Sequence, residues 1–160
     1  MHCIIPESVS IINCSNTGMM IHFDGEAKPT GGIVGEYSQP WATLKNNCSI
    51  GGSDGGIIGY IACYNSEQAA ASQPNNTTYL SGNYYHTSAS AKAVGKVDDE
   101  YSWKNASWSS SCIQSFGVGS INSSLNTWAA NNTTSSVTYA TWKNGSYGRP
   151  ELDLGELENK

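Results

Sequence analysis

The sequence predicts an all-β protein, a parallel β-helix-like solenoid with a short C-terminal helix and strand forming a cap. Three observations support this fold class. Ser, Asn, Thr and Gly supply 66 of the 160 residues, and these residue types favour turns and extended segments over long helices. Short apolar segments recur between them as two alternating motifs. One stretch near the C-terminus has the apolar spacing of a helix.

The first motif is rich in glycine and contains a short apolar strand. It reads Gly-Gly-Ile-Val-Gly-Glu-Tyr over 31–37 and recurs as Gly-Gly-Ile-Ile-Gly-Tyr-Ile over 55–61. One such strand cannot bury its apolar side alone, whereas copies stacked about 4.8 Å apart pair their backbones and form a continuous core. The small residues beside isoleucine fit the tight corners of a coil.

The second motif centres on an Asn-Cys pair. It occurs at 12–18 and again at 46–52, so that Asn13 is matched with Asn47 and Cys14 with Cys48. A weaker copy at 82–85 has Tyr84 at the cysteine position. Because the two motifs alternate along the chain, we assign residues 1–97 to solenoid repeats.

The five cysteines leave two alternatives open. They are Cys3, Cys14, Cys48, Cys63 and Cys112. An odd number excludes complete internal pairing, and the absence of Cys-x-x-Cys argues against a zinc-ribbon or thioredoxin-like site. We expect most of them to be free, buried thiols. A disulfide between Cys14 and Cys48 is the alternative, because stacked Asn-Cys motifs would bring these two residues together.

Residues 98–160 are expected to cap the solenoid within the same structural domain. A helix is expected over 121–130, and its apolar stripe consists of Ile121, Leu125, Trp128 and Ala129. The alternating segment 137–142 reads as a strand. A stacked fold leaves its last strand unpaired and its core open, so we expect the helical stripe to cover that open end.

Taken together, the motifs resemble the GLUG repeat, a family found in bacterial exported and surface proteins. The resemblance is carried by Asn-Cys-x-Asn-Thr-Gly at 13–18, the glycine motif at 31–35 and the Tyr-Tyr copy at 82–85, and it covers roughly 8–154. This chain has Asn-Cys-Ser where the family usually has Asn-Cys-Tyr, and it has few repeats. The resemblance implies a solenoid on a secreted or cell-surface protein, without catalytic residues. We expect further repeats upstream of this segment.

Composition and charge argue against several classes of function. The formal net charge is -5 and the only arginine is Arg149, so no nucleic-acid-binding surface is expected. No apolar run approaches the roughly 20 residues of a membrane helix, so we expect no membrane insertion. No spacing of His, Cys, Asp or Glu is typical of a metal site, and no cofactor is expected.

The leading hypothesis is therefore a non-enzymatic structural or adhesive module of an extracellular or cell-surface bacterial protein. Its partner would be a host protein, a matrix protein or a glycan. Two polar insertions, at 23–30 and 65–76, are the expected contact loops.

Two other hypotheses belong to different classes of function. The first is a carbohydrate-binding module whose ligand contacts are the aromatic residues Trp41, Trp103, Trp108, Tyr84 and Tyr85. The second is a polysaccharide-active β-helix enzyme, which would need two converging carboxylates. The candidate carboxylates are Asp24, Glu26, Glu36 and Asp54. Because nothing in the sequence brings two of them together, we expect them to be solvated loop residues and assign no catalytic residue.

Overall fold

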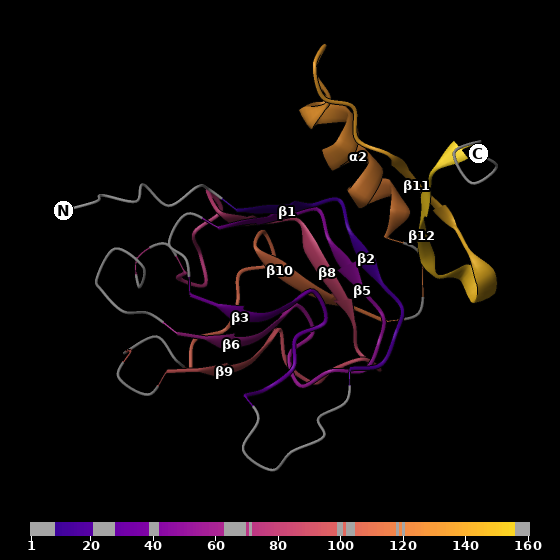
Figure 1. Ribbon diagram of the computed structural model, residues 1–160. Coiled ribbons are helices and arrows are strands. Elements are labelled where there is room, and N and C mark those ends of the chain that lie inside the picture. The colour runs from indigo at the N-terminus through magenta and orange to yellow at the C-terminus, as the bar shows by residue number, and fades with distance from the viewer. Residues whose placement is uncertain are drawn as a thin grey trace.

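The computed structural model consists mostly of short strands with one long helix (Figure 1). It describes residues 9–20, 28–38, 42–62, 70, 72–98, 101, 105–117, 119 and 121–155. The insertions expected at 23–30 and 65–76 lie partly outside these residues. No helix in the described part of the chain is long and apolar enough to cross a membrane.

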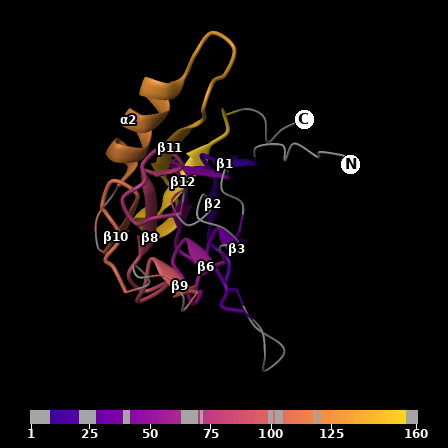
Figure 2. The same ribbon diagram turned by 90° about the vertical axis from the view of Figure 1, so that its left-hand side faces the viewer.

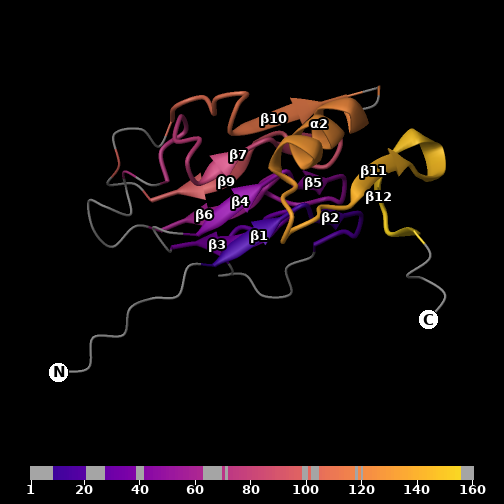
Figure 3. The same ribbon diagram turned by 90° about the horizontal axis from the view of Figure 1, so that it is seen from above.

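The chain passes through three parallel sheets in the same order three times (Figures 1 and 3). The first sheet contains β1 (Ser10–Ile12), β4 (Thr43–Lys45) and β7 (Leu80–Ser81). The second sheet contains β2 (Ser15–Asn16), β5 (Cys48–Ser49), β8 (Asn83–His86) and β10 (Ile113–Phe116). The third sheet contains β3 (Val34–Tyr37), β6 (Ile58–Ile61) and β9 (Val94–Val97). We call each traverse of the three sheets a pass.

The register of the third sheet confirms the alignment of the glycine motif. Gly31 bridges Gly55 and Val34 pairs with Ile58, as matching the two copies of the motif predicts. Ile58 in turn pairs with Val94. The alignment therefore extends to a third pass.

The register of the second sheet corrects the alignment of the Asn-Cys motif by one position. Matching the two Asn-Cys pairs would place Cys14 beside Cys48, whereas the residue that pairs with Cys48 is Ser15. Cys48 pairs with Tyr84, so the expected place of Tyr84 is confirmed. The sequence comparison aligned Asn13 with Asn47. In the structure, Asn13 is instead equivalent to Asn46, and both have a left-handed backbone conformation (φ 58° and 54°).

One apolar core is shared by the three parallel sheets. Its buried side chains include Leu44 of β4, Ile58 and Ile61 of β6, Leu80 of β7 and Ile113 of β10. Burying an aliphatic side chain of this size contributes about 1.5–3 kcal/mol. The apolar strands of the glycine motif therefore share one core with strands of the other two sheets, whereas Cys48 of the second motif belongs to a separate cluster.

Side-chain amides hold the corner between the first and second sheets. We call residues 13–14, 46–47 and 82–83 the asparagine corner. Asn47 Nδ2 donates to the carbonyl oxygen of Ile11 at 2.9 Å, and Asn83 Nδ2 donates to that of Leu44 at 2.8 Å. Each amide thus bonds the backbone of the preceding pass, and both asparagines are fully buried. These bonds give a side-chain donor to carbonyl groups of the paired strands β1 and β4.

Glycine forms the corner that leads into the third sheet, for a steric reason. We call residues 31–32, 55–56 and 91–92 the glycine corner. A Cβ atom on Gly31 would collide with the backbone nitrogen of Gly59, and a Cβ atom on Gly55 with that of Gly95. Each Cβ would also collide with a carbonyl oxygen of its own pass, that of Val34 or Ile58, so backbone of the same pass and of the following pass both obstruct it. Close approach of two backbones therefore requires glycine here.

The C-terminal segment consists of one helix and one antiparallel hairpin. Helix α2 (Asn122–Asn132) is followed by β11 (Thr141–Asn144), the 3₁₀ turn η1 (Ser146–Gly148) and β12 (Pro150–Asp153). The helix expected over 121–130 is confirmed. The strand expected over 137–142 begins only at Thr141 and runs into the turn signal at Asn144.

The expectation that this segment covers the open end of the core is wrong. Leu125 and Trp142 pack with Cys48 on the side of the second sheet, and Trp142 Nε1 donates to Asn13 Oδ1 at 2.8 Å. The segment lies at the opposite side of the molecule from β9 (Figures 1 and 2). Side chains alternate along a strand, so Cys48 and Tyr84 face away from the shared core. That side of the second sheet is apolar, and the helix covers it.

Candidate functional site

The five aromatic residues expected to contact a ligand do not form one platform. Trp41 and Trp103 lie outside the described residues. Tyr84 packs toward α2 and the hairpin, whereas the neighbouring Tyr85 is buried in the shared core. They occupy opposite faces of β8, because successive residues of a strand do. Tyr85 and Trp108 are the two members that lie together.

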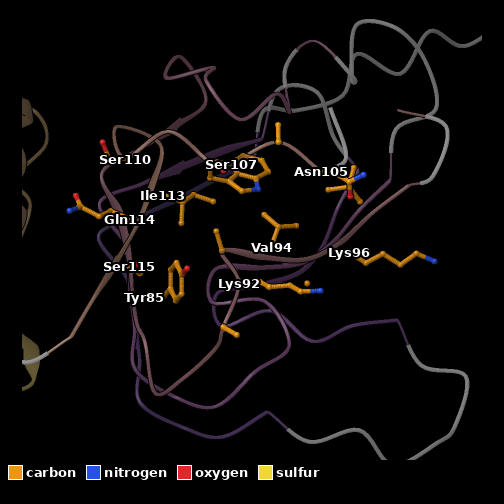
Figure 4. Close-up of a pocket in the computed structure, with 16 residues that line it drawn as sticks. Tyr85, Lys92, Val94, Lys96, Asn105, Ser107, Ser110, Ile113, Gln114 and Ser115 are labelled. Atoms are coloured by element: carbon orange, nitrogen blue, oxygen red, sulfur yellow. The ribbon is translucent and has the colours of Figure 1, made fainter. Parts of the chain in front are cut away.

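Tyr85 and Trp108 line a hollow of about 880 Å³ at the end of the third pass (Figure 4). We call it the end hollow, and its other lining residues come from 91–97, 105–110 and 113–115. It exists because the second sheet continues into a fourth strand, β10, while the third sheet stops at β9. The helix expected to cover this end lies elsewhere, so no helix in the described part of the chain covers the hollow.

The chemistry of the end hollow is polar around an apolar base. Figure 4 shows Tyr85, Val94 and Ile113 around its middle, with Lys92 and Lys96 extending along one side. The uncharged polar groups at its rim are Asn105, Ser107, Ser110, Gln114 and Ser115. No aspartate or glutamate occurs among the described lining residues. Lys92 and Lys96 therefore make one side of the hollow positive, while Asp98, outside the lining, hydrogen-bonds Tyr60 beside Lys96.

The sequence signal for this hollow is the departure of the third glycine motif from the first two. By the strand register, Ala91 and Lys92 occupy the positions of Gly55 and Gly56. Gly55 abuts the backbone of the following pass. Ala91 precedes β9, and no described strand pairs with the outer edge of β9 in the third sheet. The part of the requirement for glycine that comes from stacking therefore ends where the stacking ends. The sequence analysis assigned 91–97 to the solenoid repeats and singled out neither Lys92 nor Lys96.

The carboxylates Glu36 and Asp54 have structural partners. Glu36 Oε2 accepts from Lys28 Nζ at 2.7 Å. Asp54 Oδ2 accepts from the backbone nitrogen and the hydroxyl of Thr30, at 2.8 and 2.9 Å. Asp24 and Glu26 lie outside the described residues. Where the structure describes the chain, no group of three or more His, Cys, Asp or Glu side chains is placed to hold a metal ion.

A cation and aromatic column runs along the outer face of the third sheet. Glu36, Tyr60 and Lys96 are neighbours in register, and the ammonium groups of Lys28 and Lys96 lie 5.1 and 6.0 Å from the centroid of the Tyr60 ring. Burial, followed by a hydrogen bond to Asp98, raises the pKa of Tyr60. The neutral form of the phenol is thus favoured on this face, which adjoins the end hollow through Lys96.

The cysteines within the described residues are free. Cys14 is exposed, while Cys48 and Cys112 are buried, and Cys3 and Cys63 lie outside the described residues. The Cys14–Cys48 disulfide is therefore wrong, because the shift in register places Ser15 beside Cys48. Burial raises the pKa of the Cys48 thiol to about 12. At neutral pH this thiol is protonated and unreactive.

No protein-family model, curated protein or solved structure matches this chain. The resemblance to GLUG repeats therefore rests on the motifs of the sequence alone.

Proposed function

We propose that this chain is a non-enzymatic structural and adhesive module of a bacterial cell-surface or secreted protein. In this proposal the three passes are coils of a parallel β-solenoid of the GLUG type. The observation that carries it is the repeated parallel register, which pairs β1 with β4 and β4 with β7 in the first sheet, and β3 with β6 and β6 with β9 in the third. Repeated stacking of this kind is typical of quasi-one-dimensional scaffolds.

The internal bonding supports a scaffold that presents its surface. The asparagine corner binds each pass to the one before it, and the glycine corner packs each pass against the one after it. Few charged side chains are needed for this cohesion, since the described ion pairs join exposed groups, Lys28 with Glu36 and Lys143 with Asp153. The outer faces are then free to vary, which suits adhesion.

The adhesive proposal is tested by binding to defined surfaces. Purified protein is applied to wells coated with collagen, fibronectin or mucin, and to wells coated with albumin. We expect saturable retention on at least one of the first three and none on albumin. Equal retention on all four surfaces would contradict the proposal.

The enzymatic alternative is tested on the same preparation. The protein is incubated with pectin, xylan, alginate and peptidoglycan, and new reducing ends are measured over time. We expect no release above a heat-unfolded control. Turnover that disappears in either the Glu36→Gln or the Asp54→Asn variant would replace the adhesive proposal by a polysaccharide-active one.

A further inference from the structure

We propose that the end hollow binds an acidic oligosaccharide, with Lys92 and Lys96 facing its carboxylates and Trp108 packing against a sugar ring. This inference rests on the proposed adhesive function, since it supplies that module with a ligand site. Its volume, about 880 Å³, lies within the range of about 300–1,000 Å³ that is usual for small-ligand sites.

The charge of the hollow selects an anion. Lys92 and Lys96 are exposed, and neither ammonium group forms an ion pair with a described residue. Lys96 also lies at the end of the column that begins with Glu36. Two unpaired cations beside a shared depression attract a ligand with more than one negative charge, because their fields add.

The glycine corner argues against a peptide strand or a second copy as the occupant. Stacking on the third sheet uses Gly31 and Gly55, where any Cβ would strike the following backbone. In the third pass this position is taken by Ala91, and Lys92 follows it, so a further strand would meet side chains at the point of closest approach. Lysine on an edge strand also opposes strand addition. These side chains therefore disfavour the pairing of another strand with the open edge of β9.

The remaining groups suit a sugar. Trp108 is half-buried against the core and contributes to the lining of the hollow, so part of its indole is accessible to the C–H face of a pyranose ring. Asn105 is an exposed amide at the opening (Figure 4). Its amide both donates and accepts hydrogen bonds, which matches the hydroxyl groups of a saccharide.

The experiment compares two four-sugar ligands on the intact chain. Tetragalacturonate, which carries four carboxylates, and the neutral maltotetraose are titrated by calorimetry and by amide chemical-shift mapping. We expect tetragalacturonate to bind at least about tenfold more tightly and to shift the amides of 91–97 and 113–115. Its affinity should fall as sodium chloride rises from about 50 to 500 mM, because salt screens exposed charges.

Charge variants locate the site. Lys96→Glu is expected to weaken tetragalacturonate binding about five- to tenfold, and Lys92→Gln by a smaller factor. Lys143→Glu changes the net charge as Lys96→Glu does, but on β11, and should leave affinity within about twofold. Trp108→Ala should weaken both ligands, and circular dichroism shows whether that variant is folded. If the Trp108→Ala variant is unfolded, the site is judged from the lysine variants alone.

Each other outcome overturns the inference. Absence of binding, equal affinity for both tetrasaccharides, or equal effects of Lys96→Glu and Lys143→Glu would remove the site. Tetraglutamate that displaces tetragalacturonate with equal affinity would show a peptide-binding or unspecific anion surface. Retention on mucin or a matrix protein is measured separately, so failure of this site and failure of the adhesive proposal are distinguishable.

Discussion

The asparagine corner and the glycine corner both hold successive passes together, but the asparagine corner contacts the preceding pass and the glycine corner the following one. Both bring the backbones of successive passes together where the chain turns. Asparagine reaches back, since Asn83 donates to the carbonyl of Leu44 in the preceding pass. Glycine makes room forward, since Gly55 abuts the nitrogen of Gly95 in the following pass. One corner depends on a side chain that is present, and the other on a side chain that is absent.

This difference explains where each motif departs from its pattern. In the first pass, Cys14 stands at the position of Asn47, and no earlier pass among the described residues offers it a carbonyl. In the third pass, Ala91 stands at the position of Gly55, and no later strand among those residues crowds it. Asparagine is thus required in the second and third passes, and glycine in the first and second. A motif is kept only where a stacked neighbour needs it.

The largest expected effect is that of Gly55→Ala. The new Cβ would strike the carbonyl oxygen of Ile58 and the nitrogen of Gly95. Neither backbone group can move without breaking the stack, so we expect a loss of about 3 kcal/mol or more in the free energy of unfolding. Urea unfolding followed by circular dichroism measures it.

Two controls belong to the Gly55→Ala experiment. A Cβ on Gly35 meets nothing within 4 Å, so Gly35→Ala should stay within about 0.5 kcal/mol of the wild type. Ala91→Gly occupies the same column as Gly55 and should cost only about 0.5–1 kcal/mol of chain entropy. Equal effects at Gly55 and Gly35 would refute the steric account of the glycine corner.

The next largest effect is expected for Asn83→Ala. Asn83 Nδ2 donates to the carbonyls of Leu44 and Cys112, at 2.8 and 3.1 Å, and its Oδ1 accepts from Asn47 Nδ2 at 2.9 Å. Three buried hydrogen bonds would be lost, although Asn47 Nδ2 keeps its bond to the carbonyl of Ile11 and the carbonyl of Cys112 keeps its bond from the backbone nitrogen of residue 83. We therefore expect a loss of about 2–3 kcal/mol. Cys14→Ala, in the same column but exposed, should change stability by less than about 0.5 kcal/mol. A large effect at Cys14 would show that the column does not end where we place it.

The sequence allowed the strands to be predicted better than the corners. The repeated Gly-Gly-Ile unit fixed the register of the third sheet, because steric exclusion leaves one residue type and hence a readable motif. The Asn-Cys unit misled the alignment by one position, because two adjacent asparagines, Asn46 and Asn47, perform different tasks. The sequence alone does not say which of them takes the left-handed backbone conformation and which one donates to a strand carbonyl of the preceding pass.

The position of the C-terminal segment and the end hollow were less accessible to sequence reasoning. The apolar stripe of α2 is evident from the sequence. The surface that this stripe covers depends on the face of the second sheet to which the Cys48 side chain points. That face follows from the register, which was wrong by one. The aromatic ring of Trp108 made it a candidate from the sequence. The position of Lys96 beside a hollow depends on the third sheet having one strand fewer than the second, which the sequence does not show.

A smaller effect separates the two tasks within the asparagine corner. Asn46 has left-handed backbone (φ 54°) and its Nδ2 donates to Asn13 Oδ1 at 2.7 Å. Both Asn46→Ala and Asn46→Gly remove the hydrogen bond, but only glycine accepts the backbone without strain. We expect the alanine variant to be less stable by about 1 kcal/mol. Gly82, at the equivalent position with φ 62°, shows that glycine is accepted there. Equal stabilities would mean that the backbone conformation adds nothing to the choice of residue.

The smallest expected effect concerns Cys48, which lies between the asparagine corner and α2. Burial raises its pKa from 9.0 to about 12, so the folded state favours the neutral thiol. The resulting stabilisation is complete below the unfolded pKa and is lost as the pH rises from about 9 toward 12. At pH 9.5 we expect the wild type to lose somewhat less than about 1 kcal/mol through this group, relative to pH 7.

Cys48→Ala should remove that part of the pH dependence, whereas Cys14→Ala should keep it, because the Cys14 thiol is exposed. Urea unfolding of the three proteins at pH 7 and 9.5, under reducing conditions, measures the difference. Thiol labelling gives an independent readout, since Cys14 should react in the folded protein and Cys48 only after unfolding. Rapid labelling of Cys48 at neutral pH would mean that α2 and the hairpin leave the second sheet readily. The cohesion of the stack would then reside in its two corners alone.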